Sequence, residues 1–198
     1  MKRMIVIALL GVAFLTFAPS SSAQTQGCQP AGYTNAGPQI DTFNFIADGY
    51  PSSNSVCWSM FNAAIGQGTM VCGFYPQWTS NNFEFNYGGD VNQGFVIPTS
   101  ATYNYYTFVY FLDFQNPNPN YPGDLQLNIQ IWDQTAHTIL LTDHYDASQP
   151  ALSCARREIS AVTGSLAGHS ILVLMMGTRS DDISHIRVSS VQFWGAHM

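Results

Sequence analysis

Hydrophobic and polar residues alternate along much of the chain after residue 40, with the period of two that a β-strand requires. The stretch GDLQLNIQIWD, residues 123–133, alternates without interruption, with leucine and isoleucine on one side. The other side consists of three amides and a tryptophan, which are Gln126, Asn128, Gln130 and Trp132. The pattern predicts a strand whose apolar side lies in a core and whose polar side faces outward.

Similar short runs are separated by Gly, Pro, Asn and Asp, which favour turns. They predict strands over residues 42–46, 69–74, 82–87, 93–97, 104–114, 124–132, 137–143, 157–162, 169–176 and 183–194. One short helical turn is expected around residues 55–64. Many short strands of this kind predict an all-β fold, a two-sheet antiparallel β-sandwich.

Two runs are apolar on both faces. SILVLMMG, residues 170–177, predicts a central strand covered on both sides. NYYTFVYFLDF, residues 104–114, is nearly as apolar and requires a facing sheet about 10 Å away.

The last predicted strand changes phase. Ile186 and Val188 alternate out of step with Val191 and Phe193. A β-bulge at Ser189-Ser190 would return both pairs to the core, so we expect one there.

The N-terminus has the order of a secretory signal peptide: Lys2 and Arg3, an apolar run over residues 4–17, and small residues up to Ala23. The apolar run is shorter than the roughly 20 residues of a membrane span, so we expect cleavage and no membrane insertion. The expected organisation is a signal peptide (1–23), an N-terminal tail (24–40) and a single β-sandwich domain (41–198). The protein is expected to be secreted or periplasmic.

Cleavage after Ala23 would leave four arginines against twelve acidic residues, a net charge of −8. A chain this acidic repels nucleic acid and anionic membrane surfaces, so neither is an expected partner. Charged residues make up only 9% of the sequence. The surface is therefore expected to be polar mainly through amides and hydroxyls.

Four cysteines would remain after export, which predicts two disulfides with three possible connectivities. We favour Cys57 with Cys72, which closes a short loop, and Cys28 with Cys154, which ties the tail to the body. No Cys-x-x-Cys motif occurs and no histidine lies near a cysteine, so a zinc site is not expected.

The order of several segments is familiar. VNQGFVIP (91–98), the aromatic strand 104–114, GDLQLNIQIWD, GSLAGHSILVLMMG (164–177) and ISHIRVSSVQF (183–193) follow one another along the chain. This order resembles the galactose-binding-like jelly rolls of carbohydrate-binding modules and related secreted bacterial domains. The resemblance covers residues 82–194, and more weakly 41–80. It implies a jelly-roll fold, while the function must be argued from a site.

Members of that family often carry aspartate in the last strand, where it helps to hold a structural calcium. Here the matching segment, residues 187–191, has serines, which are poor calcium ligands, so calcium is not expected at that place. Asp41 and Asp48 remain candidates. His144 is flanked by acids but adjacent strand residues point in opposite directions, so no metal site is predicted there either.

Catalytic motifs are absent from the sequence. Glycoside hydrolysis requires two carboxylates facing each other, whereas Glu84 is expected on the outer face of its strand and Glu158 in surface ion pairs with Arg156 and Arg157. No Gly-x-Ser-x-Gly motif and no phosphate-binding glycine loop occur. The sequence thus predicts neither an enzyme nor a cofactor.

Saccharide binding requires flat aromatic rings and planar amides. The outward side of residues 124–132 supplies Gln126, Asn128, Gln130 and Trp132, and the loop GFYPQW adds Tyr75 and Trp78. We therefore expect a non-catalytic protein that binds a saccharide or another extracellular ligand through this face. The alternative is a structural or adhesive protein that acts by self-association.

Overall fold

The computed structural model describes residues 32–35, 41–49, 51, 57–71, 79–117 and 125–197. Every regular element in these ranges is a β-strand and every pairing is antiparallel, which confirms the all-β fold class. The strands are β1 (Gly32–Asn35), β2 (Asp41–Asn44), β3 (Ser59–Val71), β4 (Thr79–Val96), β5 (Tyr105–Gln115), β6 (Gln126–Asp133), β7 (Thr138–Asp146), β8 (Leu152–Thr163), β9 (Ser170–Thr178) and β10 (His185–Ala196). None of the described residues forms a helix that could cross a membrane.

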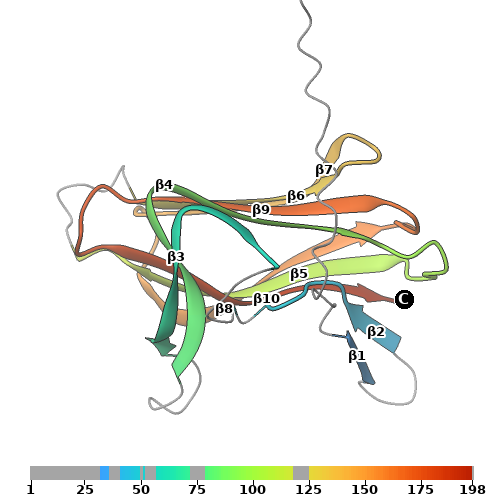
Figure 1. The fold of residues 1–198 in the computed structure, drawn as a ribbon, viewed down its shortest axis with the longest axis horizontal. Coiled ribbons are helices and arrows are strands. Elements are labelled where there is room, and N and C mark those ends of the chain that lie inside the picture. The colour runs from blue at the N-terminus through green and yellow to red at the C-terminus, as the bar shows by residue number, and fades with distance from the viewer. Residues whose placement is uncertain are drawn as a thin grey trace, which may run out of the picture.

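The strands form two layers (Figure 1). The upper layer has the order β4-β9-β6-β7, and in the lower layer β5 lies between β8 and β10. Strand β4 belongs to both layers, because residues 89–96 pair with β9 whereas residues 83–84 pair with β10. The hydrogen bonding is therefore continuous around one end of the sandwich.

Two predictions near this end are wrong. The segments 82–87 and 93–97 are halves of one strand, β4, and not separate strands. The predicted helical turn at residues 55–64 is also incorrect, because β3 begins at Ser59 and pairs with β4. Pairing with a long neighbouring strand outweighed the weak local helical pattern.

The core lies between the layers. Strand β6 alternates strictly between partly buried and buried residues, as its sequence predicts, and its buried side chains are Leu127, Ile129, Ile131 and Asp133. The lower layer contributes aromatic rings, including Tyr106 and Phe193, which stack with their centroids 5.7 Å apart. Each fully buried aliphatic or Phe side chain contributes about 1.5–3 kcal/mol, so these rows of residues hold the layers together.

The predicted bulge in β10 is confirmed. The register between β10 and β5 shifts between Ser189 and Gln192, and Ser190 has a positive φ of 51°. Ile186, Val188, Val191 and Phe193 are all fully buried. The extra residue therefore brings both pairs of side chains to the same face.

Strand β9 differs from its prediction in one respect. It is central, between β4 and β6, and its inward residues Ile171, Val173 and Met175 are fully buried. Its outward residues Leu172, Leu174 and Met176 are only partly buried, so the strand is not covered equally on both sides. These outward aliphatic side chains form the floor of a groove.

Neither Cys57 nor Cys154 carries a free thiol. Their predicted partners, Cys72 and Cys28, lie outside the described residues. The predicted connectivity therefore stays a prediction.

Candidate functional site

Strand β6 presents its amides and its tryptophan on the outer face of the upper layer. Gln126, Asn128, Gln130 and Trp132 are all partly buried. The register with β9 places apolar neighbours beside the last three, which are Met176, Leu174 and Leu172 in that order. Polar and apolar groups thus lie in adjacent rows on one surface.

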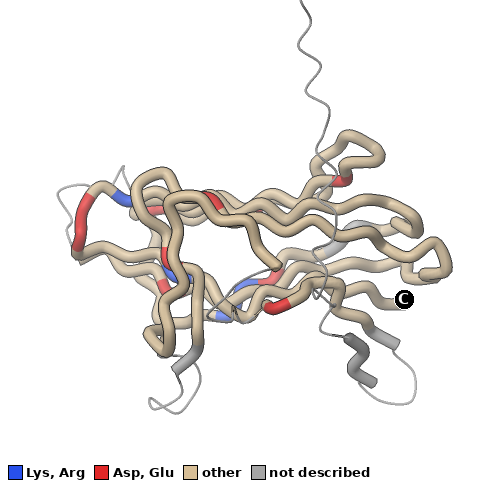
Figure 2. Tube along the Cα trace, viewed as in Figure 1, with Lys and Arg blue, Asp and Glu red and all other residues tan. Residues whose placement is uncertain are grey.

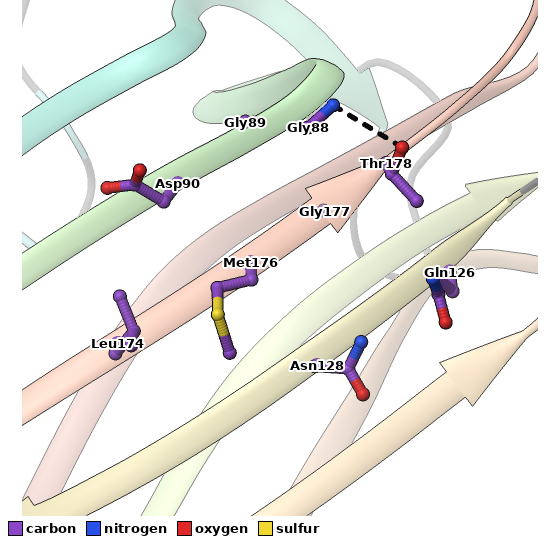
Figure 3. Close-up of a pocket in the computed structure, with 9 residues that line it drawn as sticks. All are labelled: Gly88, Gly89, Asp90, Gln126, Asn128, Leu174, Met176, Gly177 and Thr178. Carbon is purple, nitrogen blue, oxygen red and sulfur yellow. Dashed lines mark hydrogen bonds between the residues drawn. The ribbon is translucent and has the colours of Figure 1, made fainter.

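Two hollows lie on this surface and share Leu174; together they are called the outer groove below. The first, of about 470 Å³, is lined by Gly88, Gly89, Asp90, Gln126, Asn128, Leu174, Met176, Gly177 and Thr178 (Figure 3). The second, of about 430 Å³, is lined by Gln130, Trp132, Asp133, Gln134, His137, Leu172 and Leu174. An apolar floor with a few polar groups is typical of a ligand-binding site.

Trp132 lies along its own strand. Its indole Nε1–H donates to Oε1 of Gln130 at 2.9 Å, and its ring lines the second hollow. Because the N–H is already bonded, the indole has a preferred orientation before any ligand binds. A ring fixed in this way loses little conformational entropy on binding.

The side chain of Asn128 contacts a histidine of the edge strand β7. Its Oδ1 lies 2.8 Å from Nδ1 of His144, and Nε2 of the same imidazole lies 2.8 Å from Oδ2 of Asp146. Asp146 also accepts from the hydroxyl of Ser148. Hydrogen bonds from Ser148 and His144 lower the pKa of Asp146 to about 2, so it remains a carboxylate at any physiological pH.

A second histidine–carboxylate pair includes Asp133, which lines the second hollow. Asp133 is buried, and its Oδ2 lies 2.6 Å from Nδ1 of His169. Its other oxygen accepts from the backbone N–H groups of Thr135 and Ala136. Burial opposes ionisation, but the hydrogen bonds from Ala136 and His169 outweigh it and lower the pKa of Asp133. This carboxylate fixes the β6–β7 turn and so positions Trp132.

The groove carries no cation. None of its lining residues is Lys or Arg, whereas Asp90 and Asp133 are among them. Of the four described arginines, three belong to β8 and β10, and the guanidinium of Arg179 is bonded to Asn86 and to the carbonyl of Ser184. Figure 2 shows that charged residues of both signs are sparse along the described part of the chain. The groove is thus polar through amides, as the composition predicts.

The acids that could have served catalysis have structural partners. Glu158 pairs with Arg156 at 2.6 Å, as predicted. Arg157, in contrast to the prediction, points to Asp143, whose Oδ1 lies 2.7 Å from its Nη2. Glu84 lies 3.6 Å from Arg187. Within the described ranges no group of three or more His, Cys, Asp or Glu side chains could hold a metal ion.

The structure brings together four of the six predicted binding residues, since Tyr75 and Trp78 lie outside the described residues. Sequence reasoning missed three contributors: the aliphatic floor from β9, the histidine His144 and the lining residue Asp90. The floor was assigned to the core because its strand is apolar on both faces. His144 could have been found, because an alternating pattern places it on the same side of β7 as Asp146.

No protein-family model matches the sequence, and no curated protein matches it either. Solved structures do resemble the fold. One is the enzymatically active domain of tailspike protein 4 of bacteriophage CBA120, at a TM-score of 0.50 and 11% identity over 76% of this chain. The chain spans only 21% of that tailspike chain.

Two further structures have lower TM-scores. A carbohydrate-binding module, TmCBM61 in complex with β-1,4-galactotriose, has a TM-score of 0.49 and 8% identity, with 72% of this chain and 93% of that chain covered. A structure from work on carbohydrate-binding modules of the β-sandwich superfamily has a TM-score of 0.39 and 8% identity. The match covers 85% of this chain and 63% of that chain. At 11% identity, the likeness to the tailspike domain concerns the fold alone.

Proposed function

We propose that this protein is a secreted, non-catalytic jelly-roll β-sandwich that binds a saccharide through the outer groove. The observation that carries the proposal is the combination, on one hollowed surface, of an oriented indole, an aliphatic floor and amides whose NH₂ groups have no partner among the described residues. The apolar faces of a sugar ring pack on Trp132 and the floor, while its hydroxyls bond to the amides. Such sites reach roughly micromolar to millimolar dissociation constants, or about 4–8 kcal/mol.

The test is binding of the mature protein to a panel of neutral glycans, including galactan, glucan, xylan and chitin, by affinity electrophoresis and tryptophan fluorescence. Trp132→Ala should weaken binding at least tenfold, which corresponds to about 1.4 kcal/mol. Trp194→Ala is the matched control, because Trp194 makes the same indole bond, to Gln192 at 2.8 Å, but belongs to β10 in the other layer. Equal losses in both variants, or no retention by any glycan, would reject the proposal.

Self-association is the second candidate, and one observation favours it. The apolar floor continues outward to two exposed side chains on the same layer, Val96 at 59% and Ile139 at 43% relative exposure. A second copy of the chain could cover this patch. In that case sedimentation velocity should show concentration-dependent assembly that Ile139→Gln reduces, whereas a saccharide-binding protein should remain monomeric.

Export and two disulfides belong to the same proposal. Mass spectrometry of the exported protein should find Gln24 as its first residue. A peptide map without reduction should link Cys57 to Cys72 and Cys28 to Cys154. An uncleaved N-terminus would place the protein elsewhere, and a different linkage would reject the pairing but not the groove.

A further inference from the structure

The two amides at the centre of the outer groove use their carbonyl oxygens within the protein. Oε1 of Gln130 faces the indole N–H of Trp132, and Oδ1 of Asn128 faces the imidazole of His144. Their NH₂ groups have no hydrogen-bond partner among the described residues. Figure 3 shows the nitrogen of Asn128 on the side of Met176 and its oxygen turned away from β9. The groove therefore offers two N–H donors above an apolar floor.

We propose, resting on the saccharide binding inferred above, that the groove recognises acceptor oxygens of an uncharged ligand through Nε2 of Gln130 and Nδ2 of Asn128. Trp132 fixes the first donor permanently. His144 fixes the second only while its imidazole is protonated, and is thus a positioning residue that sets the polarity of Asn128. An anionic ligand is disfavoured, because no Lys or Arg lines the groove whereas the carboxylate of Asp90 does.

The hydrogen-bonding capacities of the groups dictate the switch. Asp146 remains a carboxylate and can only accept, so Nε2 of His144 always carries a proton. In the imidazolium, Nδ1 also carries a proton and donates to Oδ1 of Asn128. In the neutral ring, Nδ1 becomes an acceptor, and the bond survives only if the amide of Asn128 turns over and donates from Nδ2. The amide then presents Oδ1 to the groove in place of the donor.

No other nearby group can cause this reversal. On β7 the ring faces Asp146, and the backbone N–H of His144 donates to Oδ1 of Asp143. Hydrogen bonds from Arg157 of β8 and Tyr110 outweigh the burial of Asp143 and lower its pKa, so it too stays ionised. Across β6 and β9 the same row of the sheet ends at Asp90, with Met176 between. Of these groups, only the imidazole of His144 can either donate or accept at the nitrogen that faces Asn128.

The reversal can be measured without a ligand. In ¹⁵N-resolved NMR between pH 5 and 9, the side-chain amide resonances of Asn128 should shift with the same midpoint as the ring nitrogens of His144, and Nε2 should remain protonated throughout. His144→Phe should abolish the shift of Asn128, whereas His197→Phe, which alters a histidine beside Thr102, should preserve it. Amide resonances that do not follow the imidazole would overturn the positioning role.

The donor assignment is tested with isosteric carboxylates. Against a neutral glycan from the panel, Gln130→Glu should weaken binding roughly 2- to 10-fold at every pH, because one donor is lost. Asn128→Asp should cause a similar loss below the His144 midpoint and little loss above it. Variants that bind as tightly as the parent at acidic pH would show that the amides act as acceptors, which rejects the proposal.

The charge requirement is tested with a matched pair of polymers, β-1,4-galactan and the anionic polygalacturonate. Retention should be limited to uncharged polymers, and equal retention of polygalacturonate would overturn the selectivity. If no neutral glycan is retained, saccharide binding itself fails. The NMR titration still decides the coupling of Asn128 to His144 in that case, so the two failures are distinguishable.

Discussion

Gly177 shows how one residue near the groove depends on its missing side chain. A Cβ built at this position would lie 2.5 Å from Cγ of Phe85, whose ring is fully buried. We expect Gly177→Ala to lower the free energy of unfolding by about 1–3 kcal/mol, the usual cost of overpacking. Urea denaturation measures this loss.

Gly195 is the comparison. A Cβ there meets the edges of Phe45 and Tyr103 at 2.9–3.0 Å, and Tyr103 is only partly buried. Gly195→Ala should therefore cost less than Gly177→Ala. A larger loss at Gly195 would contradict the account of both contacts.

At the residue scale, the sequence predicted which side chains of β6 face outward but not how they are oriented. The alternation alone places Asn128 and Trp132 on one side. The direction of each amide depends on a bonding partner, and for Asn128 that partner is His144 on another strand, sixteen positions away. A contact of this kind follows from register, which the local pattern does not contain.

At the scale of elements, a partly buried ion pair between β7 and β8 connects the two layers at one edge. Arg157 of β8 lies 2.7 Å from Asp143 of β7, and Tyr110 of β5 donates to the same carboxylate at 2.6 Å. Arg157→Met would leave the carboxylate partly buried and without its cation. Removing one partner of a fully buried pair costs about 3–5 kcal/mol. Because this pair is only partly buried, Arg157→Met should lower the free energy of unfolding by about 2–4 kcal/mol, measured by chemical denaturation.

Arg156 is the matched control for this ion pair. Its side chain is 54% exposed and its partner Glu158 40%, so the pair is screened by water. Arg156→Met should change stability by about 0–1 kcal/mol. Similar losses for both arginines would contradict the role assigned to Arg157.

At the element scale, strands with a regular alternation were predicted well and those without it were not. The bulge at Ser189-Ser190 could be predicted, because a change of phase is visible in the sequence. The continuity of β4 could not be predicted, because residues 86–89 interrupt its pairing with β3 and break the alternation. The helical turn expected around residue 60 failed since β3 obtains its hydrogen bonds from a neighbour that the local pattern does not show.

For the whole molecule we expect destabilisation by acid. Asp113, Asp133 and Asp143 are buried or partly buried, which opposes ionisation, yet hydrogen bonds from His185, Ala136 and Arg157 respectively lower the pKa of each carboxyl. Their ionised forms therefore stabilise the folded state above the unfolded pKa of about 3.9, and this stability is lost as pH falls through the lower folded values. The free energy of unfolding should decrease from about pH 5 downward.

Urea denaturation between pH 3 and 7 measures this dependence. Asp143→Asn should reduce the drop, because one of the three carboxyls no longer titrates. A free energy of unfolding that is constant or rises on acidification would contradict the assignment.

The sequence by itself determined the period of the strands, the two faces of β6 and the amide-rich, cation-poor surface, because these depend on local alternation and composition. Tertiary structure decided that the outward side of β9 lies open beside β6 and forms the floor of the groove. It also decided that Asn128 contacts His144, and that Arg157 forms its ion pair with Asp143 and not with Glu158. These outcomes depend on strand order and register, which are fixed by packing over the whole sandwich and not by any single segment.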